Sequence, residues 1–457
     1  MKYVKSTFIW FIVLVAVAGY SYLDLESTKM EEAKKEEEAK LLPFNTLEVL
    51  TLTIENDDSN DKSIELERWD DGWRIVKPIE AKAHSGAVEK FLKNLAASRN
   101  DADYVMDPDP TPERLVEFGL ANPAVRVTMR VGRDLKPYTV QFGKRAPTMG
   151  VAYARLEGRK AVFRVLADAR SEANKDMLYF RNKTVLRINP VLVDQFSITR
   201  PEGYILAKLP QDGKWGLEKP VKARTDYNKV FEFLGALANA EISEFTEETK
   251  ANISTYGLDK PTISLVFWKH GDSEPTVRLD IGKRSPEKRG YYCAMSDRDY
   301  VFVLPEETIN AIPRHADDLR SRDLLYVEKE KLKRIEVHGD GGGWLVLVKG
   351  VDNEWRLGDE KGEKVDFNLV TDFIDEMTSA RIKEFVTSNL KGLGKYGLEP
   401  AVAQLLFWTE GSTAPVSLKV GKKAPSGYVY AFAGAENMVL TVDERVKRLL
   451  QTYFRNL

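Results

Sequence analysis

Residues 118–123 read FGLANP, and the same arrangement returns as YGLDKP at residues 256–261 and as YGLEP at residues 396–400. A glycine just after a short helix is the usual left-handed cap, and a proline beyond it prevents the helix from continuing. The three glycines lie 138 and 140 residues apart, at Gly119, Gly257 and Gly397. The stretch therefore predicts a helix end that is used three times in one chain.

Three further markers repeat in the same order. Tryptophans that end strand-like stretches lie 142 and 140 residues apart, at Trp73, Trp215 and Trp355. Glycines followed by two basic residues lie 139 and 139 residues apart, at Gly143, Gly282 and Gly421. A tyrosine follows each of them, at Tyr153, Tyr292 and Tyr430. We interpret the tryptophans as core anchors, because large aromatic side chains dominate burial, and these glycines as strand ends that need a positive φ.

A period near 140 residues is that of a domain, because solenoid units of ~20–50 residues cannot bury a face alone. The expected modules are residues 43–188, 189–327 and 328–457. In each module, alternating apolar residues predict strands on both sides of one amphipathic helix, and a second helix closes the module. This order indicates an α+β fold dominated by antiparallel sheet.

The amphipathic helix has a predicted apolar face in every copy. The first copy places Val88, Phe91, Leu92 and Leu95 on it. The second places Tyr227, Val230, Phe231, Leu234 and Leu237 there, and the third Phe367, Val370, Phe373, Ile374 and Met377. We expect these faces to pack on the sheets.

The amino-terminal residues predict a membrane anchor. Residues 7–23 carry no charge and, at about 1.5 Å per residue, reach about 25 Å, near the lower limit for a crossing. Lysines precede the span and acidic residues follow it, which places the bulk of the chain outside the cytoplasm. We expect residues 1–26 to anchor the chain in a bacterial inner membrane through lipid contacts, and residues 27–42 to form a charged helical stalk. A signal peptide cleaved after Ala18 is the alternative.

Three basic pairs recur at equivalent positions after the second set of glycines. They are Lys144-Arg145, Lys283-Arg284 and Lys422-Lys423. They are candidates for binding a partner or an anionic polymer. The alternative is that they are solvated hairpin turns, neutralised by acidic residues nearby.

Composition and motifs indicate no particular reaction. The 68 basic and 70 acidic residues give a net charge of −2, without the basic excess of a dedicated nucleic-acid binder. One cysteine, Cys293, and four scattered histidines do not form a metal-site pattern. The glycine-rich run at residues 339–344 lacks the lysine of a phosphate loop. We therefore expect no catalytic residues, no cofactor and no metal ion, although a carboxylate pair at a module junction remains an open alternative.

The markers together, with the anchor, resemble a bacterial family called domain of unknown function 4340. The resemblance covers nearly all of the chain after the stalk. It implies a membrane-anchored extracytoplasmic protein that accompanies gliding-type ABC transporters. The third copy departs from the pattern, because Gly358-Asp359 follow its tryptophan stretch in place of Lys-Pro.

The sequence thus predicts a non-catalytic accessory or scaffold subunit bound to an ABC permease or to other envelope proteins. Tandem modules suit this role, because they raise avidity through effective concentration. An independent protein that binds envelope glycan or lipid is the alternative.

Overall fold

The computed structural model describes residues 44–454 except 58–60, 99, 148–149, 211–212, 288, 340–342 and 435, and it does not describe the side chains of residues 100–104. The expected anchor and stalk lie outside these residues. No helix in the described part is long and apolar enough to cross a membrane. The chain divides into two compact units, Met1–Lys183 and Thr184–Leu457.

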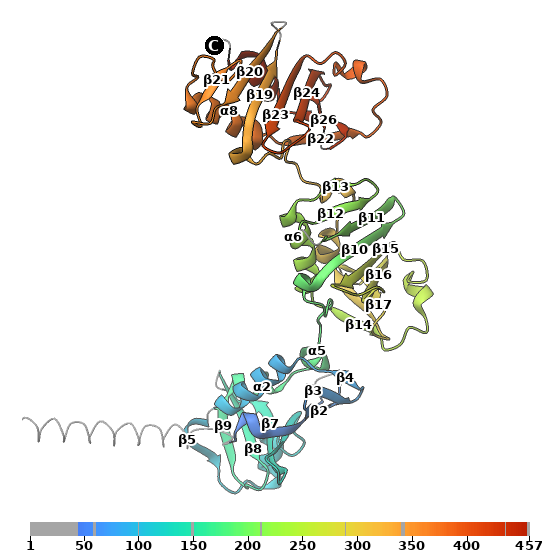
Figure 1. The fold of residues 1–457 in the computed structure, drawn as a ribbon. Coiled ribbons are helices and arrows are strands. Elements are labelled where there is room, and N and C mark those ends of the chain that lie inside the picture. Colours follow the sequence, from blue (N-terminus) through green and yellow to red (C-terminus); the bar gives the residue numbers. More distant parts are fainter. Residues whose placement is uncertain are drawn as a thin grey trace, which may run out of the picture. The chain divides into compact units, whose positions relative to one another are not determined.

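Module 1 is one nine-stranded antiparallel sheet in the order β4-β3-β2-β1-β6-β7-β8-β9-β5 (Figure 1). Its strands are β1 (Val49–Asn56), β2 (Ser63–Trp69), β3 (Gly72–Lys77), β4 (Ala81–Lys82), β5 (Asn100–Asp107), β6 (Val125–Val131), β7 (Lys136–Arg145), β8 (Val151–Leu156) and β9 (Val162–Leu166).

One helix, α2 (Ser85–Ala97), joins the two edges of this sheet, because it follows β4 at one edge and precedes β5 at the other. His84 caps its start by accepting a hydrogen bond from the Ala87 backbone N–H at 2.9 Å. The predicted apolar face is confirmed, since Val88, Phe91, Leu92 and Leu95 are all buried. They join the inner-face residues of β1, β6 and β7 in one core.

The second module repeats this plan in the order β13-β12-β11-β10-β15-β16-β17-β18-β14. Its strands are β10 (Val193–Arg200), β11 (Gly203–Lys208), β12 (Gly216–Lys219), β13 (Ala223–Arg224), β14 (Glu244–Glu247), β15 (Ile263–Lys269), β16 (Val277–Arg284), β17 (Gly290–Met295) and β18 (Val301–Pro305). Helix α6 (Tyr227–Ala238) takes the place of α2.

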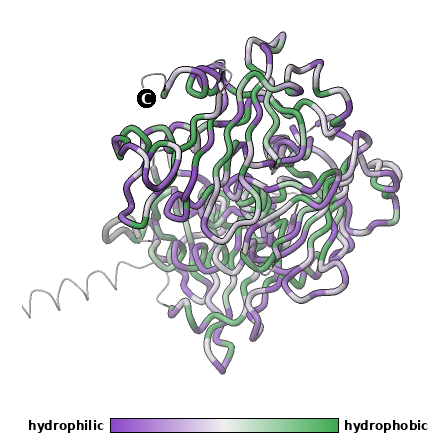
Figure 2. Tube along the Cα trace, turned by 45° about the horizontal axis from the view of Figure 1, so that its top comes forward, coloured by the Kyte–Doolittle hydropathy of each residue, from purple (hydrophilic) through white to green (hydrophobic). Residues whose placement is uncertain are grey.

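The third module has eight strands in the order β21-β20-β19-β23-β24-β25-β26-β22. They are β19 (Leu332–His338), β20 (Trp344–Lys349), β21 (Trp355–Leu357), β22 (Ile382–Thr387), β23 (Ala403–Thr409), β24 (Val416–Lys423), β25 (Val429–Ala433) and β26 (Met438–Val442), with α8 (Phe367–Ser379) as the crossing helix. Three antiparallel sheets with crossing helices confirm the predicted α+β class. Green apolar and purple polar residues alternate along many strands (Figure 2).

The helix faces of the second and third modules differ from prediction at three positions. In α6 the buried residue is Phe233, whereas Phe231 is exposed and stacks on Tyr227 at 5.9 Å between ring centroids. These two rings are four residues apart, so they are neighbours on the solvent side of the helix. In α8 Phe367 is exposed in the first turn, and the other four predicted residues are buried.

The cores begin a little before the expected module boundaries. Val185, Leu186 and Ile188 pack in the core of the second module. Leu324 and Leu325 likewise pack in the third. Each linker is therefore short, and its apolar residues serve the module that follows.

Candidate functional site

The repeated markers meet at one place in each module. In module 1, a Cβ added to Gly143 on β7 would lie 2.2 Å from the backbone oxygen of Phe118. The equivalent separations are also 2.2 Å for Gly282 to Tyr256 and for Gly421 to Tyr396. Gly143 and its equivalents are therefore required because a strand passes directly against the helix-end turn.

This contact corrects the role expected for the second set of glycines. Gly143, Gly282 and Gly421 are absent from the residues that have a positive φ, so backbone conformation does not require glycine there. The first set behaves as predicted, because Gly119, Gly257 and Gly397 all have φ of 70° and end short helices.

The repeated tyrosine of each copy packs on the aromatic residue of the helix-end turn. The ring centroids are 4.7 Å apart for Phe118 and Tyr153, 4.7 Å for Tyr256 and Tyr292, and 4.9 Å for Tyr396 and Tyr430. The repeated tryptophans lie in the main cores, where Trp73, Trp215 and Trp355 are 1%, 8% and 2% exposed. The four markers are thus parts of the packing, as expected for the tryptophans.

The first basic residue of each repeated pair lies over the helix-end turn. Lys144 Nζ donates to the Val116 carbonyl at 3.5 Å, and Lys283 Nζ donates to the Thr255 carbonyl at 3.0 Å. Lys422 flanks Gly397, since a Cβ there would lie 3.2 Å from the Lys422 Cβ. A cation beside the last carbonyls of a helix interacts favourably with its dipole.

The second basic residue of each pair reaches the closing helix of its own module. Arg145 lies 3.4 Å from Ser171 in α4 (Ala167–Ala173). The equivalent ion pairs join Arg284 to Glu306 at 2.8 Å and Lys423 to Glu444 at 3.1 Å. All six predicted partner-binding residues therefore have neighbours within their own modules, and partner binding through them stays a prediction.

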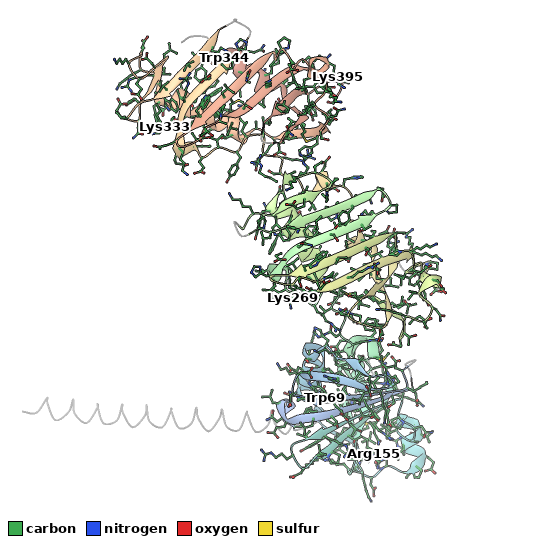
Figure 3. All side chains as sticks on the ribbon, turned by 45° about the vertical axis from the view of Figure 1, so that its right-hand side comes forward. Trp69, Arg155, Lys269, Lys333, Trp344 and Lys395 are labelled. Carbon is green, nitrogen blue, oxygen red and sulfur yellow. The ribbon has the colours of Figure 1, made fainter. Side chains whose placement is uncertain are left out.

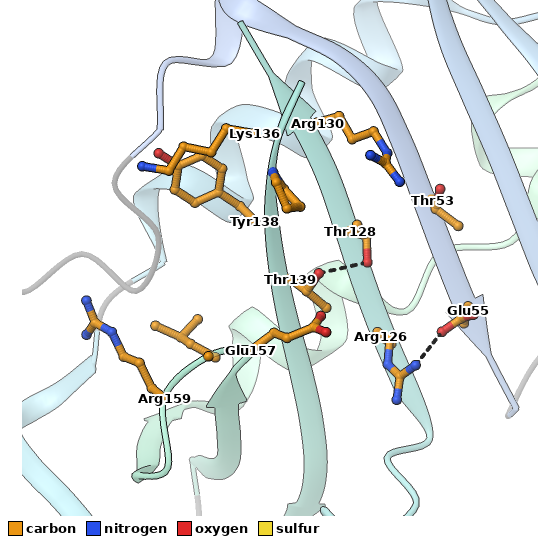
Figure 4. Close-up of a pocket in the computed structure, with 13 residues that line it drawn as sticks. Thr53, Glu55, Arg126, Thr128, Arg130, Lys136, Tyr138, Thr139, Glu157 and Arg159 are labelled. Atoms are coloured by element: carbon orange, nitrogen blue, oxygen red, sulfur yellow. Dashed lines mark hydrogen bonds and ion pairs between the residues drawn. The ribbon is translucent and has the colours of Figure 1, made fainter. Parts of the chain in front are cut away.

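A hollow lies on the outer face of the module 1 sheet, and we call it the outer hollow. Its volume is about 750 Å³, and strands β1, β6, β7 and β8 line it (Figure 4). Strand β6 alternates buried Val125, Val127 and Met129 with Arg126, Thr128 and Arg130. Since successive side chains point to opposite faces, this second set faces away from α2 into the hollow.

Cations outnumber carboxylates in the outer hollow. Its charged residues are Arg126, Arg130, Lys136, Arg159, Glu55 and Glu157. Arg126 is paired with Glu55 at 3.3 Å, while its Nε is buried without a hydrogen-bond partner. Among the described residues, Arg130, Lys136 and Arg159 form no ion pair. Sequence reasoning missed this group, although two arginines on the polar side of one alternating strand were a usable signal.

Threonines form the floor of the outer hollow. Thr128 and Thr139 lie opposite each other on β6 and β7, and their hydroxyl oxygens are 3.1 Å apart. Thr53 continues the row on β1, opposite Thr128. The site therefore offers hydroxyl groups between positive charges.

The outer faces of the other two modules carry different side chains at the same register. The sixth residue of β6, β15 and β23 is Arg130, Trp268 and Trp408, respectively. The second residue is Arg126, Ser264 and Gln404. Of these three strands, only β6 therefore carries two arginines on its outer face.

The exposed tryptophans and the cysteine described next do not gather with other functional groups as the residues of the outer hollow do. Trp69 and Trp344 are 49% and 46% exposed at different places in their modules, and the Arg74 guanidinium lies 4.2 Å over the Trp69 ring (Figure 3). Cys293 is fully buried, and burial raises the pKa of its thiol. Within the described part of the chain, no cluster of three His, Cys, Asp or Glu side chains is placed to hold a metal ion.

The fold and markers define a protein built from tandem α+β repeats. The chain belongs to the family described as Domain of unknown function (DUF4340), whose profile matches residues 73–261, 215–366 and 355–457. Each match begins at one of the repeated tryptophans, so the resemblance inferred from the markers is confirmed.

The other comparisons add no function. A comparison with curated proteins found no match. One similar solved structure is a DNA polymerase sliding clamp from Pseudomonas aeruginosa with ligand, at 7% identity over 89% of this chain and 94% of that chain. Its TM-score is 0.13, and a likeness of that size carries no argument.

Proposed function

We propose that this chain is a non-catalytic scaffold, anchored in a bacterial inner membrane by residues 7–23, with its three modules outside the cytoplasm. In this role it is an accessory subunit of an ABC-type transport system. One observation carries the proposal: the repeated frame presents Arg130, Trp268 and Trp408 at one register position. Copies that keep one packing scheme but differ in surface chemistry suit the binding of several non-identical partners.

The test is affinity purification of the full-length protein in mild detergent, followed by mass spectrometry of the co-purifying chains. A version lacking residues 1–26 separates contacts made by the anchor from contacts made by the modules. We expect an ABC permease and its ATPase in near-stoichiometric amount. Recovery of neither chain would overturn the accessory-subunit role.

Surface variants then locate the contact. Arg130→Glu, Trp268→Ala and Trp408→Ala each change the outer face of one module, and a variant in a face that contacts the permease is expected to reduce recovery of the permease together with its ATPase. The double variant Lys90→Glu with Lys93→Glu is the control, because both lysines are exposed on α2, across the sheet from the outer hollow. Equal losses in this control would contradict the role of the outer faces.

The second candidate function is an independent envelope-binding protein. The unpaired cations and hydroxyls of the outer hollow favour this alternative. The buried tryptophan markers give it no support, because they are closed to a ligand. If this second function is correct, the same purification should recover the protein alone or with bound glycan or lipid.

A further inference from the structure

We propose that the outer hollow of module 1 binds an acidic oligosaccharide of the cell envelope. This inference rests on the extracytoplasmic location proposed above, but not on an ABC partner. The proposed ligand binds module 1 only, and modules 2 and 3 remain available for contacts with other partners.

The charges of the hollow call for an anion. Arg130, Lys136 and Arg159 have no ion-pair partner among the described residues, and the Lys136 ammonium lies 5.2 Å over the Tyr138 ring. Guanidinium groups bind carboxylates and phosphates through strong charge-assisted hydrogen bonds. A ligand that carries negative charge would satisfy donors that the protein leaves free.

The spacing of the charges calls for more than one anionic group. Arg126 and Arg130 are four residues apart on one straight strand, which places their Cα atoms about 13 Å apart. A single phosphate or carboxylate is too small to engage both ends of the hollow. An oligomer with repeated acidic groups fits the span and the volume of about 750 Å³.

The chemistry between the charges favours a saccharide over a peptide. Thr53, Thr128 and Thr139 place hydroxyls on the floor, where they can exchange hydrogen bonds with sugar hydroxyls. The backbone of β6 is already paired on both sides, with β1 and β7. An acidic peptide therefore cannot add to this face as a strand, which is the usual way that a peptide gains main-chain hydrogen bonds from a sheet.

The experiment uses purified full-length protein in detergent and measures binding by calorimetry. The probe is a hexamer of galacturonic acid, and maltohexaose is the neutral oligosaccharide of equal length. Expected results are measurable binding of the acidic hexamer, at least tenfold weaker binding of maltohexaose, and weakening with added salt. Absence of binding by the acidic hexamer would overturn the proposal.

Variants place the site. Arg130→Glu with Arg159→Glu should weaken binding of the acidic hexamer by about tenfold or more, because two charge-assisted contacts become repulsive. Lys90→Glu with Lys93→Glu on α2 makes the same charge change on the opposite side and should leave binding within about twofold. If the arginine pair variant does not fold, Arg130→Gln with Arg159→Gln replaces it. An equal effect of both charge reversals would overturn the location.

Two further probes separate other anionic ligands. Polyglutamate that binds as tightly as the acidic hexamer would overturn the saccharide assignment. Stronger binding to phosphatidylglycerol vesicles than to the hexamer would assign the site to a lipid surface and also overturn it. If the protein binds the acidic hexamer but recovers no transporter, the accessory role is overturned and this inference stands. If it recovers the transporter but does not bind the hexamer, this inference is overturned and the accessory role stands.

Discussion

Arg320 and Glu436 form an ion pair in which both side chains are only 3% exposed, with 3.0 Å between nitrogen and oxygen. Arg320 lies at the end of the second module, and Glu436 lies between β25 and β26 of the third. The arginine also lies 3.8 Å over the Phe385 ring, and Arg224 reaches the other Glu436 oxygen at 2.9 Å. Two modules of the second compact unit are therefore joined by charges removed from water.

Removing the Glu436 carboxylate is expected to open this junction. In Glu436→Gln, Asp317, at 3.4 Å, is the one ionic partner that Arg320 keeps among the residues that the structure describes. Loss of one member of a buried pair costs about 3–5 kcal/mol. Hydrogen exchange of peptides from β26 measures the change in opening free energy on the full chain.

A double variant and an exposed pair serve as controls for this prediction. Adding Arg320→Met should recover much of the lost stability, because the unpaired buried charge is gone. Glu444→Gln breaks the exposed pair with Lys423 and should cost under about 1 kcal/mol. Unchanged protection of β26 in Glu436→Gln would show that the pair does not hold the junction.

Two glycines of the second module should respond to alanine in opposite directions. Gly282→Ala forces a Cβ against the Tyr256 carbonyl and should destabilise the module by about 1–3 kcal/mol. Gly235→Ala lies inside α6, where the added Cβ would meet no atom within 4 Å apart from the neighbouring backbone of the helix itself, and it should stabilise the module by about 0.5–1 kcal/mol. Chemical unfolding of both variants under the same conditions checks the sign. A neutral Gly282→Ala would remove close approach as the reason for that marker.

The buried thiol gives an independent measure of the same module. Cys293 is the one cysteine of the chain and is fully buried, so a thiol reagent should reach it only when the second module opens. Gly282→Ala should speed labelling by about fivefold to a hundredfold, since 1.4 kcal/mol corresponds to a tenfold change. Gly143→Ala, in the other compact unit, should leave the rate unchanged. Fast labelling of the native protein would contradict the burial.

Alkaline pH should weaken one link between β14 and the helix-end turn of the second module. The Tyr256 hydroxyl donates to Glu247 at 2.8 Å, and this hydrogen bond, followed by burial, raises the pKa of Tyr256 to about 12. The neutral phenol is the stabilising form. Its contribution is therefore complete below the ordinary pKa of 10.0 and is lost as pH rises towards about 12.

The variant Tyr256→Phe tests this pH dependence. It should be less stable than the native protein at pH 8, and the difference should shrink between about pH 10 and 12. Unfolding by denaturant at several pH values measures the difference, and phenolate absorbance follows the ionisation. A constant difference across this range would contradict the assigned hydrogen bond.

Periodic patterns predicted most elements of the fold, but not the strand β5 or its neighbours. The apolar face of α2 and the alternation of β6 follow directly from residue spacing. The far-edge position of β5 does not, because it depends on α2 carrying the chain from one edge of the sheet to the other. The choice of Phe233 over Phe231 likewise depends on how the helix is rotated against its sheet.

The outer hollow shows why a site was harder to predict than a fold. Arg126 and Arg130 belong to one visible pattern, but Arg159 lies beyond β8. The pairing of β6, β7 and β8 brings these residues together, and the spacing of residues in the sequence does not reveal that pairing. The basic pairs were predicted to bind a partner because they repeat, yet each pair has neighbours within its own module.

The meeting of a strand glycine, a helix-end turn and a tyrosine has a consequence for how relatives are recognised. Chains that carry these markers are expected to form the same contact between strand and helix-end turn, because the marker residues build that contact. The side chains on the outer face of each sheet, such as Arg130, Trp268 and Trp408, can change without disturbing this contact. The repeated markers therefore fix how each module packs, while the outer faces of the three copies differ in the groups that they offer to a ligand.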